Sequence, residues 1–563
     1  MAETNFEVEL DDEPSIPTGD QLDIQEPILS KNELYAWYLY AFACEVYAVV
    51  SLTSFIPLIL EQFSFEKGVL NTDHTIPCNN STAFSISEEV RCVVNVFGIW
   101  VDTASYSLYT YAFSVVLQAI TAISIGATAD HGAMRKTLLL SFAFAGSVSA
   151  MLFLFVTPSL FLLAGVFTIV GNVCFGASFV CFNGFLPVLV RNHQDVRKIS
   201  SQIRSYIAKK NYTPSDEGNH NLEEDHNNFE EASLLATHNQ QSLDPELSKL
   251  SEDLEKEKDR ISTHISTRGF ASGYFGGIIL LIVCLIISFL LNSTVFSLQI
   301  GVFLSGAWWF LFSLLVIKWL RPRPGPPLYL DNGRKVGWFD YIIFAWTRLW
   351  RTVRHAKKLE MSFRFLVAWF FISDGYTTIT SVALLFAKTT LHVPDTGLII
   401  IALIVPVVGL IGAILFPKIQ KQFDLTTKQT IILLNIMLLC IPIYGCLGFV
   451  LPVGGLRSAH ELYFLAAWFG FAIGAIQSYC RTLFGELVPR GRETEFFALY
   501  AVTDKGSSWL GPTMVAIITD TTHEIRYGFA ILLILLLLPI PILLSVDVIK
   551  GKADAAKSSE NED

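Results

Sequence analysis

Long apolar stretches separated by short polar loops dominate the chain from about residue 36 to residue 547. The runs 142–156, 270–291 and 531–544 contain no charged residue. About 20 apolar residues in a helix cross roughly 30 Å of hydrocarbon. This pattern predicts an all-α polytopic membrane protein with twelve transmembrane helices, near 36–60, 105–127, 137–157, 160–183, 268–291, 299–319, 364–386, 396–416, 428–450, 460–480, 496–519 and 527–547.

Composition supports a membrane protein and places its charge outside the bilayer. The 563 residues are 52% hydrophobic and 16% charged, with a mean hydropathy of +0.47, whereas soluble proteins carry about 25% charged residues. The net charge is −11, and residues 1–33 hold ten acidic side chains against the single Lys31. We therefore expect this segment to be a disordered acidic tail.

The polar segments divide the chain and indicate its orientation. We expect helices 1–4 in 34–190, a polar and largely disordered cytosolic loop in 191–267, helices 5 and 6 in 268–319, a cytosolic linker in 320–363, helices 7–12 in 364–548 and a cytosolic tail in 549–563. Lysine and arginine gather in the loops after helices 2, 8 and 10. The positive-inside rule therefore predicts that both termini are cytosolic.

The loop between helices 1 and 2 is predicted to face the lumen. It contains two overlapping N-glycosylation acceptor sites at Asn79 and Asn80, and the pair Cys78 and Cys92. A disulfide between these cysteines would require an oxidising compartment. Acceptor sites also arise by chance, so the sequence leaves their use open.

Both long cytosolic segments contain local motifs. In 191–267 a short helix is predicted to begin at Asp244-Pro245, and Glu230 with Leu234 and Leu235 fits an acidic dileucine signal for a sorting adaptor. An ordinary solvated loop is an equally good interpretation of that signal. In the linker, 338–359 combines apolar and basic positions at helical spacing, which predicts an amphipathic helix in the headgroup region of the lipid bilayer.

The two groups of six helices show traces of an internal repeat. Cys181, Phe185 and Arg191 at the end of helix 4 recur at a constant offset as Cys480, Phe484 and Arg490 at the end of helix 10. Six plus six helices joined by a long linker resembles the layout of the major facilitator superfamily. We therefore expect two pseudo-symmetric six-helix bundles with a polar site between them.

The loop between helices 2 and 3 resembles the cytosolic latch motif of that superfamily. Its residues of interest are Gly126, Asp130, Gly132, Arg135 and Lys136, although the second glycine comes two rather than three residues after the acid. In that superfamily the aspartate closes the cytosolic side by charge pairing and helix capping. The alternative is an ordinary basic turn that obeys the positive-inside rule.

Two matching strings place carboxylates inside apolar helices. FACEVY at 42–47 and FISDGY at 371–376 share the pattern F-x-x-acid-x-Y. At 1.5 Å per residue, Glu45 and Asp374 lie roughly 13 Å into helices 1 and 7, near the bilayer midplane. The superfamily geometry would place them across from each other, with Tyr47 and Tyr376 nearby.

These acids have a functional and a structural interpretation. A carboxylate in the bilayer is costly and marks a functional site, here for the amino group of a solute, for proton coupling or for both. Alternatively, each acid is permanently tied to a basic partner. Lys505 and Arg481 could be such partners. They and Asp504 are themselves site candidates, as are the amides Asn172, Asn183 and Gln477, which could equally serve as interhelical hydrogen-bond partners.

The sequence contains no pattern typical of an enzyme. We find no metal-ligand cluster, no nucleophile elbow and no phosphate-binding loop. We therefore expect no catalysis, no cofactor, no bound metal and no nucleic-acid partner.

One segment resembles a particular family. ELVPRGRETEFFALYAVTDKGSSWLGP at 486–512 and ELYAWYLYAFACE at 33–45 are similar to segments of the fungal vacuolar amino-acid effluxers called autophagy-related protein twenty-two. The resemblance implies a facilitator in the vacuole membrane that releases amino acids recovered by autophagy. The alternatives are a non-transporting sensor or docking factor of that membrane and a facilitator for another small solute.

Overall fold

The computed structural model describes most of residues 27–560. It leaves out 72–73, 79–90, 131–133, 212–244, 293, 324–342, 344–345, 348, 351–352, 355–356, 358, 451–453 and 489–492 within that range. The acceptor sites Asn79 and Asn80, the residue Gly132 of the latch motif and the dileucine residues Glu230, Leu234 and Leu235 lie outside the described residues.

The first half of the chain forms long helices around an apolar core. The first crossing begins with Ser30, whose side chain accepts a hydrogen bond from Glu33 N and caps the helix. This first crossing consists of α1 (Lys31–Val46), the π-helical segment η1 (Tyr47–Phe55) and α2 (Ile56–Lys67). The other crossings of this half are formed by α3 (Thr103–Asp130), α4 (Met134–Leu152), η4 (Phe153–Phe155), η5 (Pro158–Leu160), α5 (Phe161–Arg191), α8 (Pro245–Leu290) and α9 (Val295–Trp319).

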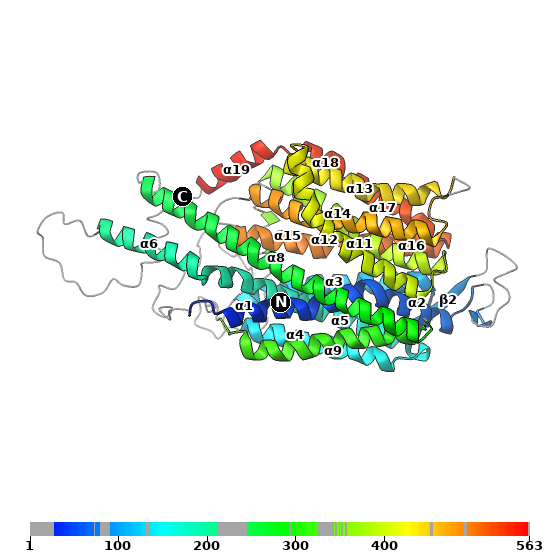
Figure 1. Cartoon of the computed structure of the whole chain (residues 1–563). Coiled ribbons are helices and arrows are strands. Elements are labelled where there is room, and N and C mark those ends of the chain that lie inside the picture. The colour runs from blue at the N-terminus through cyan, green and yellow to red at the C-terminus, as the bar shows by residue number, and fades with distance from the viewer. Residues whose placement is uncertain are drawn as a thin grey trace, which may run out of the picture.

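The second half repeats this arrangement. It comprises α11 (Glu360–Thr389), α12 (Asp395–Gln422), α13 (Thr427–Leu447), α14 (Ala459–Glu486), α15 (Glu493–Ser507), α16 (Leu510–Thr522), η6 (Ile525–Tyr527), α17 (Gly528–Leu537), α18 (Pro539–Ser545) and α19 (Val548–Glu560). Figure 1 shows the two halves side by side, the first in blue to green and the second in yellow to red. They meet where α16 and α15 pack on α3 and where α12 packs on α8.

Eleven helices in the described part of the chain are long and apolar enough to cross a membrane. They match eleven of the twelve predicted helices. At the predicted span 496–519 the structure instead has two shorter helices, α15 and α16, separated at Ser508 and Trp509. Pro512 lies in the first turn of α16, where its missing N–H removes no hydrogen bond.

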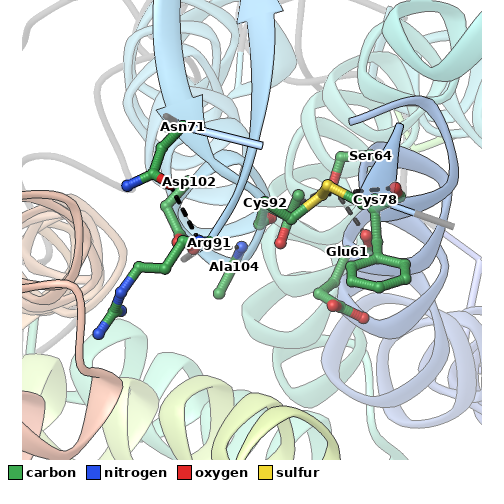
Figure 2. Close-up of a disulfide and its surroundings, with 10 residues drawn as sticks. Glu61, Ser64, Asn71, Cys78, Arg91, Cys92, Asp102 and Ala104 are labelled. Carbon is green, nitrogen blue, oxygen red and sulfur yellow. Dashed lines mark hydrogen bonds between the residues drawn. A yellow bond between two sulfur atoms is a disulfide. The ribbon is translucent and has the colours of Figure 1, made fainter. Parts of the chain in front are cut away.

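The loop between helices 1 and 2 is more ordered than its composition indicates. It contains an antiparallel sheet of β1 (Val69–Leu70), β2 (Cys92–Val96) and β3 (Ile99–Asp102). Strands β2 and β3 are joined through Phe97 and Gly98, both with positive φ, as a two-residue hairpin turn requires. A disulfide links Cys78 to Cys92 beside the sheet (Figure 2).

The described residues of 191–267 form two helices, whereas the sequence predicts a single short one. Residues Gln194–Asn211 form α6, and α6 packs on the first turns of α8. The predicted helix does begin at Pro245, but it continues without interruption into the fifth crossing. Figure 1 shows α6, the start of α8 and α19 together at one end of the bundle, the terminal end, and the sheet at the other, the sheet end.

The structure describes only part of the linker, and its amphipathic helix in the headgroup region stays a prediction. Its described residues are helical at several positions between Ile343 and Lys357. Ile343 and Trp350 are 65% and 62% exposed, whereas Leu349 and Val353 pack against the core. Exposed aromatic and aliphatic side chains on such a helix suit the bilayer interface.

Candidate functional site

Asp504 forms the centre of a polar cluster that joins three helices of the second half. Its Oδ1 accepts hydrogen bonds from Ser373 Oγ at 2.6 Å and from Tyr376 OH at 3.1 Å, both on α11. Gln477 of α14 donates from Nε2 to Tyr376 OH at 3.1 Å. Asp504 itself lies on α15 and is half-buried. Three of the predicted site residues, Tyr376, Gln477 and Asp504, are thus brought together.

A cation lies one helical turn from this cluster. Arg481 follows Gln477 by four residues on α14, so both occupy one face, and both are exposed. The Arg481 guanidinium lies 5.9 Å from the ring centre of Phe270 on α8, and thereby contacts the other half. Lys505 lies on α15, but its side chain is outside the described residues.

Asp374 has a different environment, because it caps a helix. It is fully buried, and both carboxylate oxygens lie within hydrogen-bond distance of Gly511 N, at 3.0 and 2.8 Å. Gly511 is in the first turn of α16, where backbone N–H groups lack intrahelical partners and attract negative charge. Among the described residues, the hydrogen-bond donor to the Asp374 carboxylate is thus a helix N-terminus inside the bundle.

Glu45 and Asp374 contact different helices, and their placement across from each other stays a prediction. Glu45 packs against α8, where a Cβ on Gly273 would come within 2.6 Å of Glu45 Cγ. Tyr47 is fully buried in the first half and stacks on Trp309 at 5.3 Å between ring centres. The two F-x-x-acid-x-Y strings therefore have different surroundings, because their neighbours in the two halves differ.

The two amide side chains of helix 4 lie in different environments. Asn172 is buried and its side-chain amide donates to Ser114 Oγ at 2.7 Å, while its backbone carbonyl accepts from Gln118 Nε2 at 3.1 Å. These bonds join α5 to α3, the interhelical role given above as the alternative. Asn183, nearer the end of α5, is exposed.

The basic residues of the latch motif contact their own half. Arg135 is buried with its guanidinium 5.6 Å from the Phe185 ring centre, and Lys136 donates to the Ile317 carbonyl at 2.8 Å. Gly126 and Asp130 lie in the last turns of α3, and the side chain of Asp130 is outside the described residues. The latch stays a prediction.

Sequence reasoning missed two partners of the polar cluster. Ser373 immediately precedes Asp374 in FISDGY and donates to Asp504. Tyr111 of α3, from the first half, lies in electrostatic range of both Asp374 and Asp504. Ser373 carried a signal, since it lies one helical turn before Tyr376, whereas no pattern in the sequence indicates Tyr111.

Comparison with known proteins identifies the family. Residues 29–556 match the family described as "Vacuole effluxer Atg22 like". The chain belongs to this family. Relatives in the Atg22 family include autophagy-related protein 22-2 of Sclerotinia sclerotiorum, 41% identical over 95% of this chain and 82% of the relative. Autophagy-related protein 22-1 of Penicillium rubens is 40% identical over 93% of this chain and 91% of the relative.

Solved structures with the same fold are transporters of the major facilitator type. The inward-open xylose transporter XylE from E. coli has a TM-score of 0.51 and 11% identity, over 91% of this chain and 96% of that one. A POT family transporter in complex with 5-aminolevulinic acid has a TM-score of 0.53 and 12% identity, over 94% and 98%. The Atg22-family chain therefore has the major facilitator fold predicted from its sequence.

Proposed function

We propose that this protein exports amino acids from the vacuole lumen to the cytosol and so returns the products of autophagic breakdown to metabolism. Membership of the vacuole effluxer family supports export, and the major facilitator fold supports alternating access between two bundles. The substrate and the direction are our inference.

The observation that carries the amino-acid assignment is the half-buried carboxylate of Asp504 with its hydroxyl partners. Ser373 and Tyr376 orient this acid through hydrogen bonds to a single oxygen, Oδ1. A carboxylate held in this way inside a membrane bundle has the charge and the acceptors that an α-ammonium group requires.

The cation on the neighbouring turn complements the acid. Gln477 links the Tyr376 hydroxyl to α14, and Arg481 presents an exposed guanidinium about 6 Å along the same helix. An amino acid is a zwitterion, so a site with an acid and a guanidinium on adjacent helices can engage both of its charges. Tyr500 lies near both groups and stacks on Trp369, which gives the site an aromatic wall.

The sheet end is our choice for the lumenal face. The disulfide between Cys78 and Cys92 lies there, and disulfides persist in oxidising compartments. The helices that carry the described chain ends, α1 and α19, begin or end toward the opposite side (Figure 1). With the positive-inside rule, this orientation makes both termini cytosolic.

The test is efflux from proteoliposomes loaded with the twenty amino acids. Asp504→Asn removes the charge and keeps the shape, and we expect it to lower efflux at least about tenfold, since a lost charged contact of about 1.4 kcal/mol has that effect. Asp424→Asn, at an exposed position in the loop between α12 and α13, is the matched control. N-acetylated amino acids, which lack the ammonium group, should not be exported.

Two results would overturn the proposal. One is an unchanged efflux of every amino acid in Asp504→Asn at equal protein levels. The other is a wild-type protein that binds amino acids and exports none, which would favour the sensor.

A further inference from the structure

A second contact between the halves, at the sheet end, contains more acids than bases. Asp102, the last residue of β3, donates from its backbone N to Asp520 Oδ1 of α16 at 2.8 Å. Ser105, three residues later on α3, donates to the Ala516 carbonyl at 3.1 Å. These bonds join the first half to the second half beside the sheet.

A lysine makes the neighbouring contact. Lys388 of α11 donates to the Leu58 carbonyl at 3.2 Å, and its Nζ lies 3.7 Å from Glu61 Oε2. The Glu61 side chain is 8% exposed, and its Oε2 accepts no hydrogen bond from the part of the chain that the structure describes. A buried carboxylate oxygen without a hydrogen bond is costly, so this contact is incompletely satisfied.

The charged groups at this contact come from seven elements or their ends. We call them the acid latch; they are Glu61 of α2, Arg91 before β2, Asp102 of β3, Lys388 of α11, Asp395 of α12, Asp520 of α16, and Glu524 and Arg526 beside and within η6. Five are acids and three are bases. If all were ionised, closing the halves would bring two excess negative charges together in a partly buried contact.

The disulfide-linked sheet gives the latch a fixed edge. Asp102 pairs with Val93 of β2, the residue after the disulfide-bonded Cys92, and its Oδ1 accepts from Ala104 N at 3.0 Å, which caps α3. Figure 2 shows Asp102 and Arg91 to the left of the disulfide between Cys92 and Cys78, with Glu61 below the disulfide. If the halves part at this end, Asp520 and Lys388 move away from Asp102 and Glu61.

We propose that the acid latch is a proton-operated closure, in which uptake of a proton by Asp102 stabilises contact between the two halves at the sheet end. In this step one proton from the solvent at the sheet end binds the Asp102 carboxylate, and no other covalent bond forms or breaks. The inference concerns the conformational equilibrium and holds for any transported solute.

The titration of Asp102 has the required direction. Burial raises the pKa of Asp102 from its ordinary 3.8 to about 6, and the Asp520 carboxylate adds to the rise, while Ala104 N–H and Arg91 oppose it. In the open state Asp102 is hydrated and its pKa returns toward 3.8. The closed contact is therefore most stable below about pH 4 and loses stability as the pH rises to about 6, by up to about 100-fold in the closed-to-open ratio.

The experiment measures the distance across the latch in the full-length protein. Spin labels are attached through non-canonical amino acids at Ile99 on β3 and Thr522 at the end of α16, both exposed, so that the native cysteines stay intact. The protein is placed in phosphatidylcholine nanodiscs, and electron–electron double resonance gives the short-distance population from pH 4.5 to 7.5. We expect this population to fall as the pH rises.

Two variants and one control decide the outcome. Asp102→Asn should reduce the pH-dependent change in the closed-to-open ratio to less than about tenfold. Asp520→Asn keeps an oxygen that can accept the hydrogen bond from Asp102 N, but it removes the negative charge that repels the Asp102 carboxylate. The midpoint of the transition should therefore move to lower pH. If the contact were only structural, the midpoint would not move. Asp424→Asn should behave as wild type. A full pH response in Asp102→Asn, or an unshifted transition in Asp520→Asn, overturns the proposal, whether or not the protein exports amino acids.

Discussion

Replacing Asp374 by asparagine tests whether this buried acid caps α16 or binds the solute. One backbone donor, Gly511 N, is shared by the two carboxylate oxygens at 3.0 and 2.8 Å. It therefore counts as a single charge-assisted hydrogen bond, which contributes about 1.5–3 kcal/mol, with a further contribution from the helix N-terminus. Asparagine keeps one acceptor oxygen and loses the charge, so we expect a loss of about 1–2 kcal/mol.

The assay compares thermal stability and transport on the same preparation. We expect Asp374→Asn to lower the apparent Tm of the purified protein by about 1–2 °C and to retain most of the efflux per folded molecule in proteoliposomes. Asp504→Asn, at the half-buried acid, should show the opposite pattern, with little change in Tm and a large loss of efflux. The two variants are thus matched in chemistry and differ only in the environment of the acid.

A clear result would refute this reasoning. If Asp374→Asn kept the wild-type Tm and abolished efflux, the acid would be acting on the solute or on a proton. The role of Asp374 as the cap of α16 would then be wrong.

Three further predictions concern stability at other contacts between elements. Gly474→Ala should destabilise the protein by about 1–3 kcal/mol, because its Cβ would lie 2.0 Å from a carbonyl oxygen of α12. Gly506→Ala should leave the stability unchanged, because its Cβ would meet nothing within 4 Å. Thermal denaturation compares the two variants. Arg323→Met should lower the free energy of unfolding by about 3–5 kcal/mol, because it leaves the Glu33 carboxylate, which is 0% exposed, without its ion-pair partner. An unchanged Tm would contradict this. Replacing Cys78 and Cys92 by serine should cost about 3 kcal/mol for a loop of this length, and reduction of the wild type should lower its Tm to that of the double variant.

Most of the fold could be predicted from the sequence because membrane crossing is a local property. An apolar run of about 20 residues is readable without knowledge of its neighbours, and eleven predicted helices correspond to long helices of the structure. The start of α8 at Pro245 was also readable, because proline at a first helical position is a local signal. The glycine and proline of 506–512 could have indicated the break between α15 and α16.

The candidate site was only partly readable. The strings around Glu45 and Asp374 look equivalent in sequence, yet one acid packs against α8 and the other caps α16. The partner of Asp374 lies 137 positions away along the chain, and no periodicity connects them. For the same reason the contact of Asp102 with Asp520, 418 positions apart, had no signal in the sequence.

The sequence by itself therefore determined that this protein is a membrane-spanning bundle of two related halves, because hydrophobic length and loop charge act residue by residue. Only the tertiary structure decided that Asp374 caps a helix, that Asp504 is held by hydroxyl groups and that Asp102 joins the halves. A carboxylate in a bundle takes its role from its hydrogen-bond donors, and those donors come from helices that are distant in the chain and adjacent only in the fold.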